Sequence, residues 1–269
     1  MSEENKPIDL AQALRILDNV SKEFFITEAW IPSLKRTVKI QEITAKQQKS
    51  IIESAIDSVV SKSTFTKVFY NIVESNCLED KAVIEAFTVA DKASIAFSMR
   101  KQISNTIKVV LDEDSKIELE VSLDEIISKF SSYDHPENQI IKFEKNGVII
   151  EVIVGLPLFS TESAFDAIIY GKEKSENQVE EIKNLVTNAF LGETAKYIKE
   201  IKVGEQSLNY TSLHNQQKIL VVEKFPAALV QKILEKIVLF KKDLETLSTV
   251  IKDELTKTIE VDNLLFLTN

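Results

Sequence analysis

The chain has 269 residues, which is enough to bury a substantial core as one large domain or as two small ones. Hydrophobic residues make up 44% and charged residues 28%, the balance of a globular protein. The formal net charge is −9, and the basic residues are spread among acidic ones. Binding along a nucleic-acid backbone needs a stripe of basic residues, and the sequence has none. We therefore expect no nucleic-acid partner.

Glycine and cysteine are both scarce, and this excludes several kinds of site. The five glycines are scattered singly, whereas phosphate-binding loops and dinucleotide fingerprints need them clustered. The single cysteine, Cys77, excludes an internal disulfide and a multi-thiolate metal site, and it fits a reducing cytoplasm. The first residues, MSEENKPIDL, are polar and acidic, unlike a signal peptide. No apolar run approaches the ~20 residues that span a bilayer, so we expect no membrane partner.

The N-terminal part is predicted to form one helix and then a β-hairpin. Leu10, Leu14 and Leu17 recur at helical spacing after Asp9, a plausible N-cap, and the helix is expected to end before Ser21. Residues 25–31 and 36–43 alternate between apolar and polar side chains on either side of a break at 32–34. This pattern indicates a hairpin.

The next elements are predicted to be mainly helical. Thr44 and Gln47 have the spacing of a capping box. Helices are expected over 44–59, 65–73, 81–86, 89–103 and 122–130, and strands over 106–111 and 117–121, on either side of an acidic turn.

The clearest local feature is the hairpin in QIIKFEKNGVIIEVIVGLP. Asn146 and Gly147 tolerate the positive φ of a type I′ turn, so we take them as the two loop residues. This register pairs Phe143 with Ile150 and Ile141 with Val152 on one face. It pairs Lys142 with Glu151 on the other face, which makes the register self-consistent.

After Pro157 the pattern becomes mostly helical. Helices are expected over 161–170, 177–198 (broken or capped near Gly192), 212–223 and 227–249, with a small hairpin over 198–210. The sequence thus predicts an α+β protein whose C-terminal half is mainly helical. Its expected parts are a tail and helix at 1–24, a mixed hairpin and helix region at 25–157, and a mainly helical region with a small hairpin at 158–269.

No residues are grouped in a way that predicts catalysis, a bound cofactor or a metal site. His135 lies in a turn and His214 in the first turn of a predicted helix, so both are expected to be surface or capping residues. The acidic residues form turns and solvated helix faces, and no four-ligand zinc pattern is present. The single tryptophan, Trp30, is either a core or half-buried aromatic or an interface anchor.

The order of the elements resembles a family of T-even-type bacteriophage baseplate proteins, the small hub-associated component of myophages. Four segments carry the resemblance over roughly residues 26–240: AWIPSLKRTVKIQEITAKQQKSIIESA, ADKASIAFSMRKQISNTIKVV, VSLDEI followed by FEKNGVIIEVIVGLP, and LNYTSLHNQQKILVVEKFPAALVQKI. Some members carry cysteine pairs in the hairpin that here contains LDEDSKIEL, which suggests a zinc knuckle. This chain has acidic turn residues there, so no metal role is carried over.

The resemblance implies a structural or assembly protein of a contractile phage tail baseplate that acts at the central hub through contacts with other baseplate or tail hub proteins. It is compatible with several copies of the protein per assembly. It also implies that the protein is in the host cytoplasm during assembly and in the tail baseplate of the virion. Two alternatives stay open: a transient assembly chaperone for the hub that is absent from the mature virion, and an unrelated enzyme or small-molecule binder. The helix over 9–20 and the tail beyond Thr256 lie outside the shared core.

The N-terminal helix is the best candidate for a partner-binding element, with Leu10, Leu14 and Leu17 as its anchors and Trp30 as a further candidate. A helix of this length is marginal alone in water, so its apolar face must rest on another surface. That surface is either the protein's own core or a groove on a neighbouring subunit.

Because the sequence offers no metal ligand set, prolonged chelation is expected to leave both the circular dichroism spectrum and the melting temperature unchanged. Loss of structure on adding a chelator would contradict this expectation.

Overall fold

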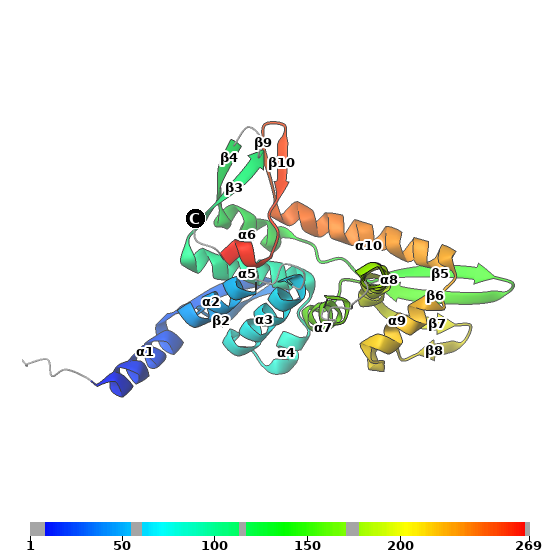
Figure 1. Ribbon diagram of the computed structural model, residues 1–269, viewed down its shortest axis with the longest axis horizontal. Helices are drawn as coiled ribbons and strands as arrows, with labels where there is room; N and C mark the ends of the chain where they lie inside the picture. The colour runs from blue at the N-terminus through cyan, green and yellow to red at the C-terminus, as the bar shows by residue number, and fades with distance from the viewer. Residues whose placement is uncertain (1–8, 55–60, 113–116, 171–177, 267–269) are drawn as a thin grey trace, which may run out of the picture.

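A computed structural model describes residues 9–54, 61–112, 117–170 and 178–266 (Figure 1). In chain order these residues form α1 (Leu10–Phe24), β1 (Ile26–Ile31), β2 (Arg36–Gln41), α2 (Ala45–Glu53), α3 (Ser61–Asn76), α4 (Lys81–Glu85), α5 (Val89–Ile103), β3 (Thr106–Asp112), β4 (Ile117–Ser122) and α6 (Leu123–Ser132). These are followed by β5 (Gln139–Lys145), β6 (Val148–Val154), α7 (Phe159–Tyr170), α8 (Gln178–Tyr197), β7 (Ile198–Val203), β8 (Gln206–Leu208), η1 (Tyr210–Ser212), α9 (Asn215–Glu223), α10 (Ala227–Ser248), β9 (Thr249–Lys252), β10 (Leu255–Thr258) and η2 (Asn263–Phe266). The chain is an α+β protein, as predicted.

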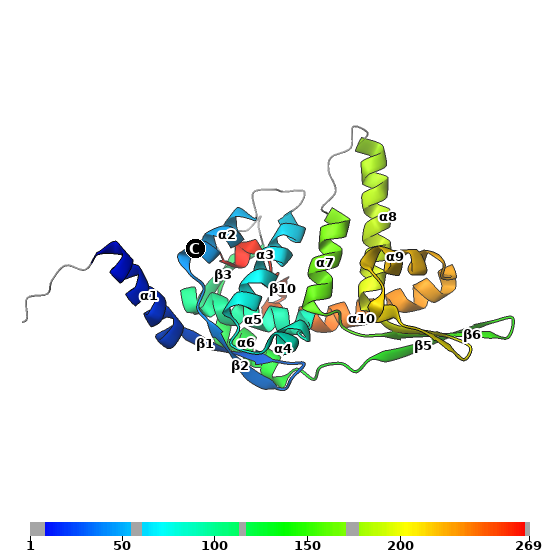
Figure 2. The same ribbon diagram turned by 90° about the horizontal axis from the view of Figure 1, so that it is seen from below.

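The elements gather into two lobes that lie side by side (Figures 1 and 2). The first lobe contains α2 to α6, η2 and three separate antiparallel hairpins, β1–β2, β3–β4 and β9–β10. The second lobe contains the sheet β5-β6-β7-β8 with α8 and α9. Helix α7 stands between the lobes, and α10 runs from the second lobe to the first.

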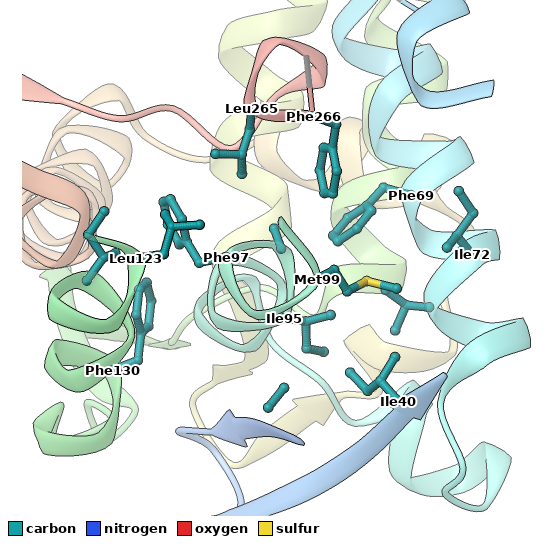
Figure 3. Close-up of a cluster of buried hydrophobic side chains, with 14 of the residues drawn as sticks. Ile40, Phe69, Ile72, Ile95, Phe97, Met99, Leu123, Phe130, Leu265 and Phe266 are labelled. Carbon is teal, nitrogen blue, oxygen red and sulfur yellow. The ribbon is translucent and has the colours of Figure 1, made fainter. Parts of the chain in front are cut away.

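Each lobe has its own hydrophobic core. The first core includes Ile40, Phe69, Phe97, Leu123 and Phe130, and Figure 3 shows these side chains around α5. The second core lies between the sheet and the helices α7 to α10, and it includes Val152, Phe165, Ile201, Ile233 and Phe240.

The two lobes are not consecutive along the chain. The first core takes its residues from 29–130, from Phe159 and from 247–266. Apart from Val89 and Ala90, the second core takes its residues from 141–240. Tyr133 and Leu244 pack against both cores, so the chain passes between the lobes at these two places. Residues on both sides of the expected boundary at 157 contribute to each core.

The N-terminal part follows the predicted local pattern, with one difference. Asp9 caps α1, because its Oδ1 accepts a hydrogen bond of 2.7 Å from the Gln12 amide. The helix continues to Phe24, so the predicted end before Ser21 is wrong. Residues 21–24 include neither glycine nor proline, so no helix-breaking residue ends the helix after Val20. Thr44 and Gln47 form the predicted capping box at the start of α2.

The β5–β6 hairpin has the predicted register. Phe143 pairs with Ile150, Ile141 with Val152, and Lys142 with Glu151, whose side chains form an ion pair of 2.6 Å. The loop residues Asn146 and Gly147 have φ of 54° and 75°, the left-handed values that a type I′ turn requires.

Two features of the second lobe differ from the prediction. Strand β7 pairs with β6, which joins the two predicted hairpins into one four-stranded sheet. Helix α8 runs through Gly192 without a break. A Cβ at Gly192 would lie 2.8 Å from Ile169 Cδ1, so glycine here allows α7 and α8 to approach closely.

The C-terminal segment also differs from the prediction. Helix α10 ends at Ser248, and Thr249 begins a further hairpin, β9–β10, that turns through Asp253 at a φ of 55°. Beyond it, Leu265 and Phe266 return to the first core, where Phe266 is fully buried. Leu265 and Phe266 of the tail are therefore part of the first core of this chain.

Replacing Gly147 with valine is expected to lower the free energy of unfolding by roughly 1–3 kcal/mol, because a β-branched residue is strained at positive φ. The position is open, with no atom within 4 Å of an added Cβ, so the backbone alone sets the cost. Gly147→Asn is the control, since asparagine tolerates this conformation, and it should stay close to wild type. Equal urea midpoints for the two variants would contradict the assignment.

Candidate interaction site

The apolar face of α1 is the most exposed large hydrophobic surface that the sequence predicted. Leu10, Leu14 and Leu17 are spaced at i, i+4 and i+7, which places them on one face of the helix. They are 75%, 56% and 63% exposed, and the neighbouring Ile16 is 45% exposed. Figures 1 and 2 show why: α1 projects from the first lobe and does not lie along it.

The exposure of this face bears on one of the two resting surfaces expected for α1, the protein's own core. The described residues of the two cores do not cover the three leucines, so the protein's own core is not their resting place. A short helix in water gains little from its backbone hydrogen bonds alone. The helix therefore presents a row of apolar side chains that is available to another molecule.

Trp30 does not join this surface. It lies near the far end of β1, half-buried against the first core, and its carbonyl oxygen accepts a 2.6 Å hydrogen bond from Ser94 Oγ. Its indole Nε1 is buried and has no acceptor among the described residues. The structure thus places Trp30 as a half-buried aromatic, one of the two alternatives that the sequence left open.

A buried network of charges at the junction of α3, α7 and α8 was missed by the sequence analysis. Asp166 is fully buried and lies 3.4 Å from Lys196 Nζ, and it also accepts a 3.0 Å hydrogen bond from Thr66 Oγ1. Lys196 Nζ lies 2.6 Å from Glu193, which in turn pairs with Lys241 of α10 at 3.1 Å. The sequence does contain a signal for this network, because a charged residue lies within each of the apolar segments SAFDAIIY and TAKYI.

The electrostatics of this network keep Lys196 and Glu193 charged. Burial lowers the pKa of Lys196, but the carboxylates of Glu193, Asp166 and Glu162 outweigh it, and the pKa is raised overall. Burial raises the pKa of Glu193, but Lys196 and Lys241 outweigh it, and the pKa is lowered overall. Groups held in one charge state do not exchange protons near neutral pH, so the network fits a structural role better than acid–base chemistry.

A second polar group lies where α5 meets the β1–β2 turn. Asp91 is fully buried and accepts hydrogen bonds from the amide of Ser33, at 2.9 Å, and from the amide and hydroxyl of Thr88, at 2.6 and 2.8 Å. Its oxygens thus hold the turn against the helix start. A carboxylate with these three donors acts as a cap that joins the two elements.

The two histidines have different environments. His214 stands at the N-cap of α9, and its amide donates to Gln217 Oε1 at 3.0 Å, as a capping residue. His135 is half-buried with its ring against Tyr133, so the expectation of a surface or capping residue is wrong for it. Burial lowers the pKa of His135 despite the nearby Asp91.

Two further side chains with reactive groups, Cys77 and Lys199, are buried and half-buried, respectively. Cys77 is buried, and burial raises the pKa of its thiol, which disfavours the nucleophilic thiolate. Burial, with the charge of Lys218, lowers the pKa of Lys199 to about 8, and its ammonium donates to the Leu156 carbonyl at 2.6 Å.

Two further classes of site find no support in the described part of the chain. No three His, Cys, Asp or Glu side chains there are grouped closely enough to hold a metal ion. No helix among the same residues is long and apolar enough to cross a membrane.

Comparison with known proteins gives no relative: neither a family model, nor a curated protein, nor a solved structure matches this chain.

Replacing Lys196 with methionine is expected to lower the free energy of unfolding by about 3–5 kcal/mol, because it leaves the carboxylate of Asp166 buried without its cation. Lys241→Met is the matched control, since this lysine is far more exposed and its ion pair contributes about 0–1 kcal/mol. Chemical denaturation of both variants measures the difference. Similar losses for the two would show that the pair does not hold the junction.

Proposed function

We propose that this chain is a structural or assembly protein of a contractile phage tail baseplate, acting at the central hub through protein–protein contacts. The observation that carries the proposal is the uncovered apolar face of α1, on a helix that projects from the protein. An amphipathic helix that binds a groove through anchors at i, i+4 and i+7 is a common mode of protein recognition. The sequence resemblance over residues 26–240 is the reason for proposing the phage tail baseplate as the assembly in which the chain acts.

The same proposal makes the chain a binding protein and not an enzyme. The buried carboxylates and lysines are engaged in hydrogen bonds and ion pairs that connect secondary-structure elements. An acid–base pair for catalysis needs groups whose environments drive their pKa values toward the working pH. Charged groups that serve packing contacts support a scaffold role. The partners proposed are other baseplate or tail hub proteins.

Quantitative mass spectrometry of purified phage particles, compared with infected-cell lysate, tests the proposal. A fixed number of copies per particle is expected. Presence in lysate together with absence from particles would replace the structural role with that of a transient hub chaperone. If the chain associates with tail intermediates in neither sample, the proposed function is wrong.

The triple substitution Leu10→Gln, Leu14→Gln and Leu17→Gln is expected to abolish co-purification with the other hub proteins while leaving the melting temperature unchanged. The leucines are already exposed, and exposed substitutions usually change the free energy of unfolding by less than about 0.5 kcal/mol. Arg15→Gln with Asn19→Gln, exposed positions on the same helix, is the control and should retain binding.

Deletion of residues 1–20 should give the same result as the triple substitution. A truncated protein that melts at a clearly lower temperature would show that the helix rests on its own fold. A truncated protein with unchanged stability and unchanged assembly would remove α1 from the proposal.

A further inference from the structure

Strand β5 forms one edge of the four-stranded sheet in the second lobe, because it pairs with β6 on one side only. The Ile149 carbonyl on β6 accepts a 2.9 Å hydrogen bond from the Gly204 amide, just beyond β7, so the backbone groups of Ile149 face β7. Its partner on β5, Glu144, therefore has its amide and carbonyl directed to the free edge. Lys142 and Ile140 follow by alternation.

Little of the described structure covers this edge. The side chain of Lys142 is 69% exposed, Ile140 is 59% exposed, and Glu144 is exposed too. The described contact to an edge backbone group is a long hydrogen bond of 3.5 Å from Lys232 Nζ to the Lys142 carbonyl, which confirms that this carbonyl points away from β6. A carbonyl oxygen has two lone pairs, so it still accepts from another donor. Figures 1 and 2 show the end of the β5–β6 hairpin projecting from the second lobe.

Strand β5 lacks the features that usually stop an edge strand from pairing with another chain. Proteins protect such edges with very short strands, bulges, prolines or charges. The opposite edge of the same sheet, β8, is three residues long. In contrast, β5 has seven residues, contains no proline and pairs with β6 without a bulge. The two charges on its outer face, Lys142 and Glu144, have opposite signs, so they repel some partner strands and attract others.

These charges select one pairing of β5 with the β5 strand of a second copy. In an antiparallel pair, the edge residues 140, 142 and 144 face the same set of the other strand. The registers that place Lys142 opposite itself or Glu144 opposite itself bring like charges together, which is destabilising. The register centred on Ile141 places Ile140 opposite Lys142 and forms no ion pair. In the register centred on Phe143, each Lys142 faces Glu144 of the second copy.

The register centred on Phe143 also joins apolar side chains on the inner face. Phe143 then faces Phe143 of the second copy, and each phenylalanine lies beside Ile150, its partner on β6. Phe143 is half-buried against the second core, so part of its ring is free for this contact. On the outer face, Lys142 lies between Glu151 of its own chain, 2.6 Å away, and Glu144 of the second copy. Opposite charges on one face and aromatic rings on the other favour the same register.

We propose that β5 binds the β5 strand of a second copy of this chain, antiparallel and centred on Phe143, so that two four-stranded sheets form one sheet of eight strands. Backbone hydrogen bonds between the two edges supply affinity, as in β-strand addition, and the pairs of Lys142 with Glu144 fix the register. An interface of one strand from each copy is small, and small interfaces are typically transient. Helix α1 lies at the opposite end of the molecule, so both α1 helices of the dimer stay free (Figures 1 and 2).

Charge exchange between the two edge positions tests the proposal. Sedimentation of the full chain over a concentration series up to about 1 mM should show a monomer–dimer equilibrium. Lys142→Glu places a second carboxylate opposite Glu144, and Glu144→Lys places a second ammonium opposite Lys142, so each variant alone should associate at least about tenfold more weakly. An equimolar mixture of the two variants should form heterodimers, because opposite charges face each other again. Lys145→Glu, an equally exposed change on the inner face, is the control and should dimerise like wild type.

Cysteine cross-linking tests the register. Phe143→Cys should form a disulfide-linked dimer on oxidation, because the Cα atoms of a facing pair that is not hydrogen-bonded lie about 4.5 Å apart. Lys145→Cys is the control, since position 145 faces Ile141 in this register, and it should cross-link far more slowly. If Phe143→Cys does not fold, the charge variants decide alone, since their positions are exposed.

Four results would each overturn the proposal. They are a wild-type chain that stays monomeric throughout the concentration series, dimers that neither charge variant weakens, a mixture of the two variants that fails to associate, and cross-linking at position 145 that is as fast as at position 143.

Discussion

The buried ion pair between Asp166 and Lys196 is the interaction on which the arrangement of the two lobes depends. Asp166 belongs to α7, Lys196 to α8, and Thr66 on α3 donates to the same carboxylate. Removing these charges from water is costly, and the cost is offset only when the partners meet in good geometry. A shift of α7 by a fraction of a turn would leave a charge unpaired. Apolar packing alone tolerates such shifts more readily, so the pair selects one alignment of the three helices.

Close packing around the pair supports the same alignment. Gly192 lets α8 approach Ile169 of α7, and Glu193 on the next position carries the network to Lys241 of α10. Lys92 of α5 and Glu162 of α7 add an ion pair of 2.5 Å, largely buried, on the first-lobe side. The junction therefore combines charge pairing with a glycine contact, and α1 projects from a body whose own elements are firmly oriented.

Local elements could be predicted from the sequence, whereas most contacts between distant segments could not. The β5–β6 register followed from Asn146 and Gly147 because turn geometry and side-chain alternation act over a few residues. The pairing of β6 with β7 joins segments separated by two helices, and no periodicity records it. The insertion of Phe266 was missed for the same reason, since an apolar cluster in a tail does not say which groove it fills.

The helical spacing of the leucines on α1 could be read from the sequence, whereas the burial of the polar residues could not. Leu10, Leu14 and Leu17 form a helical pattern, but the pattern alone does not say whether the core covers them, and the structure shows that they are exposed. Asp166 and Lys196 look like ordinary charged helix residues until the fold shows which face is covered. His135 was misplaced because a turn sequence indicates the surface, while here the turn crosses between the two cores beside Tyr133. Whether a polar residue is buried depends on the segments that pack against it. These segments are distant in the sequence, so the local sequence does not show the burial.

The interrupted layout of the first lobe has a consequence for the order in which the protein forms during translation. Its core draws on residues 29–130 and is then completed by Leu247, Val250, Leu265 and Phe266. The second lobe is contained almost entirely within the chain between these parts, so a ribosome releases all of its residues first. The second lobe can close while synthesis continues, but the first must wait with apolar surface uncovered. Such contacts between distant residues slow folding and favour aggregation, so this half of the protein has the greater need of a chaperone.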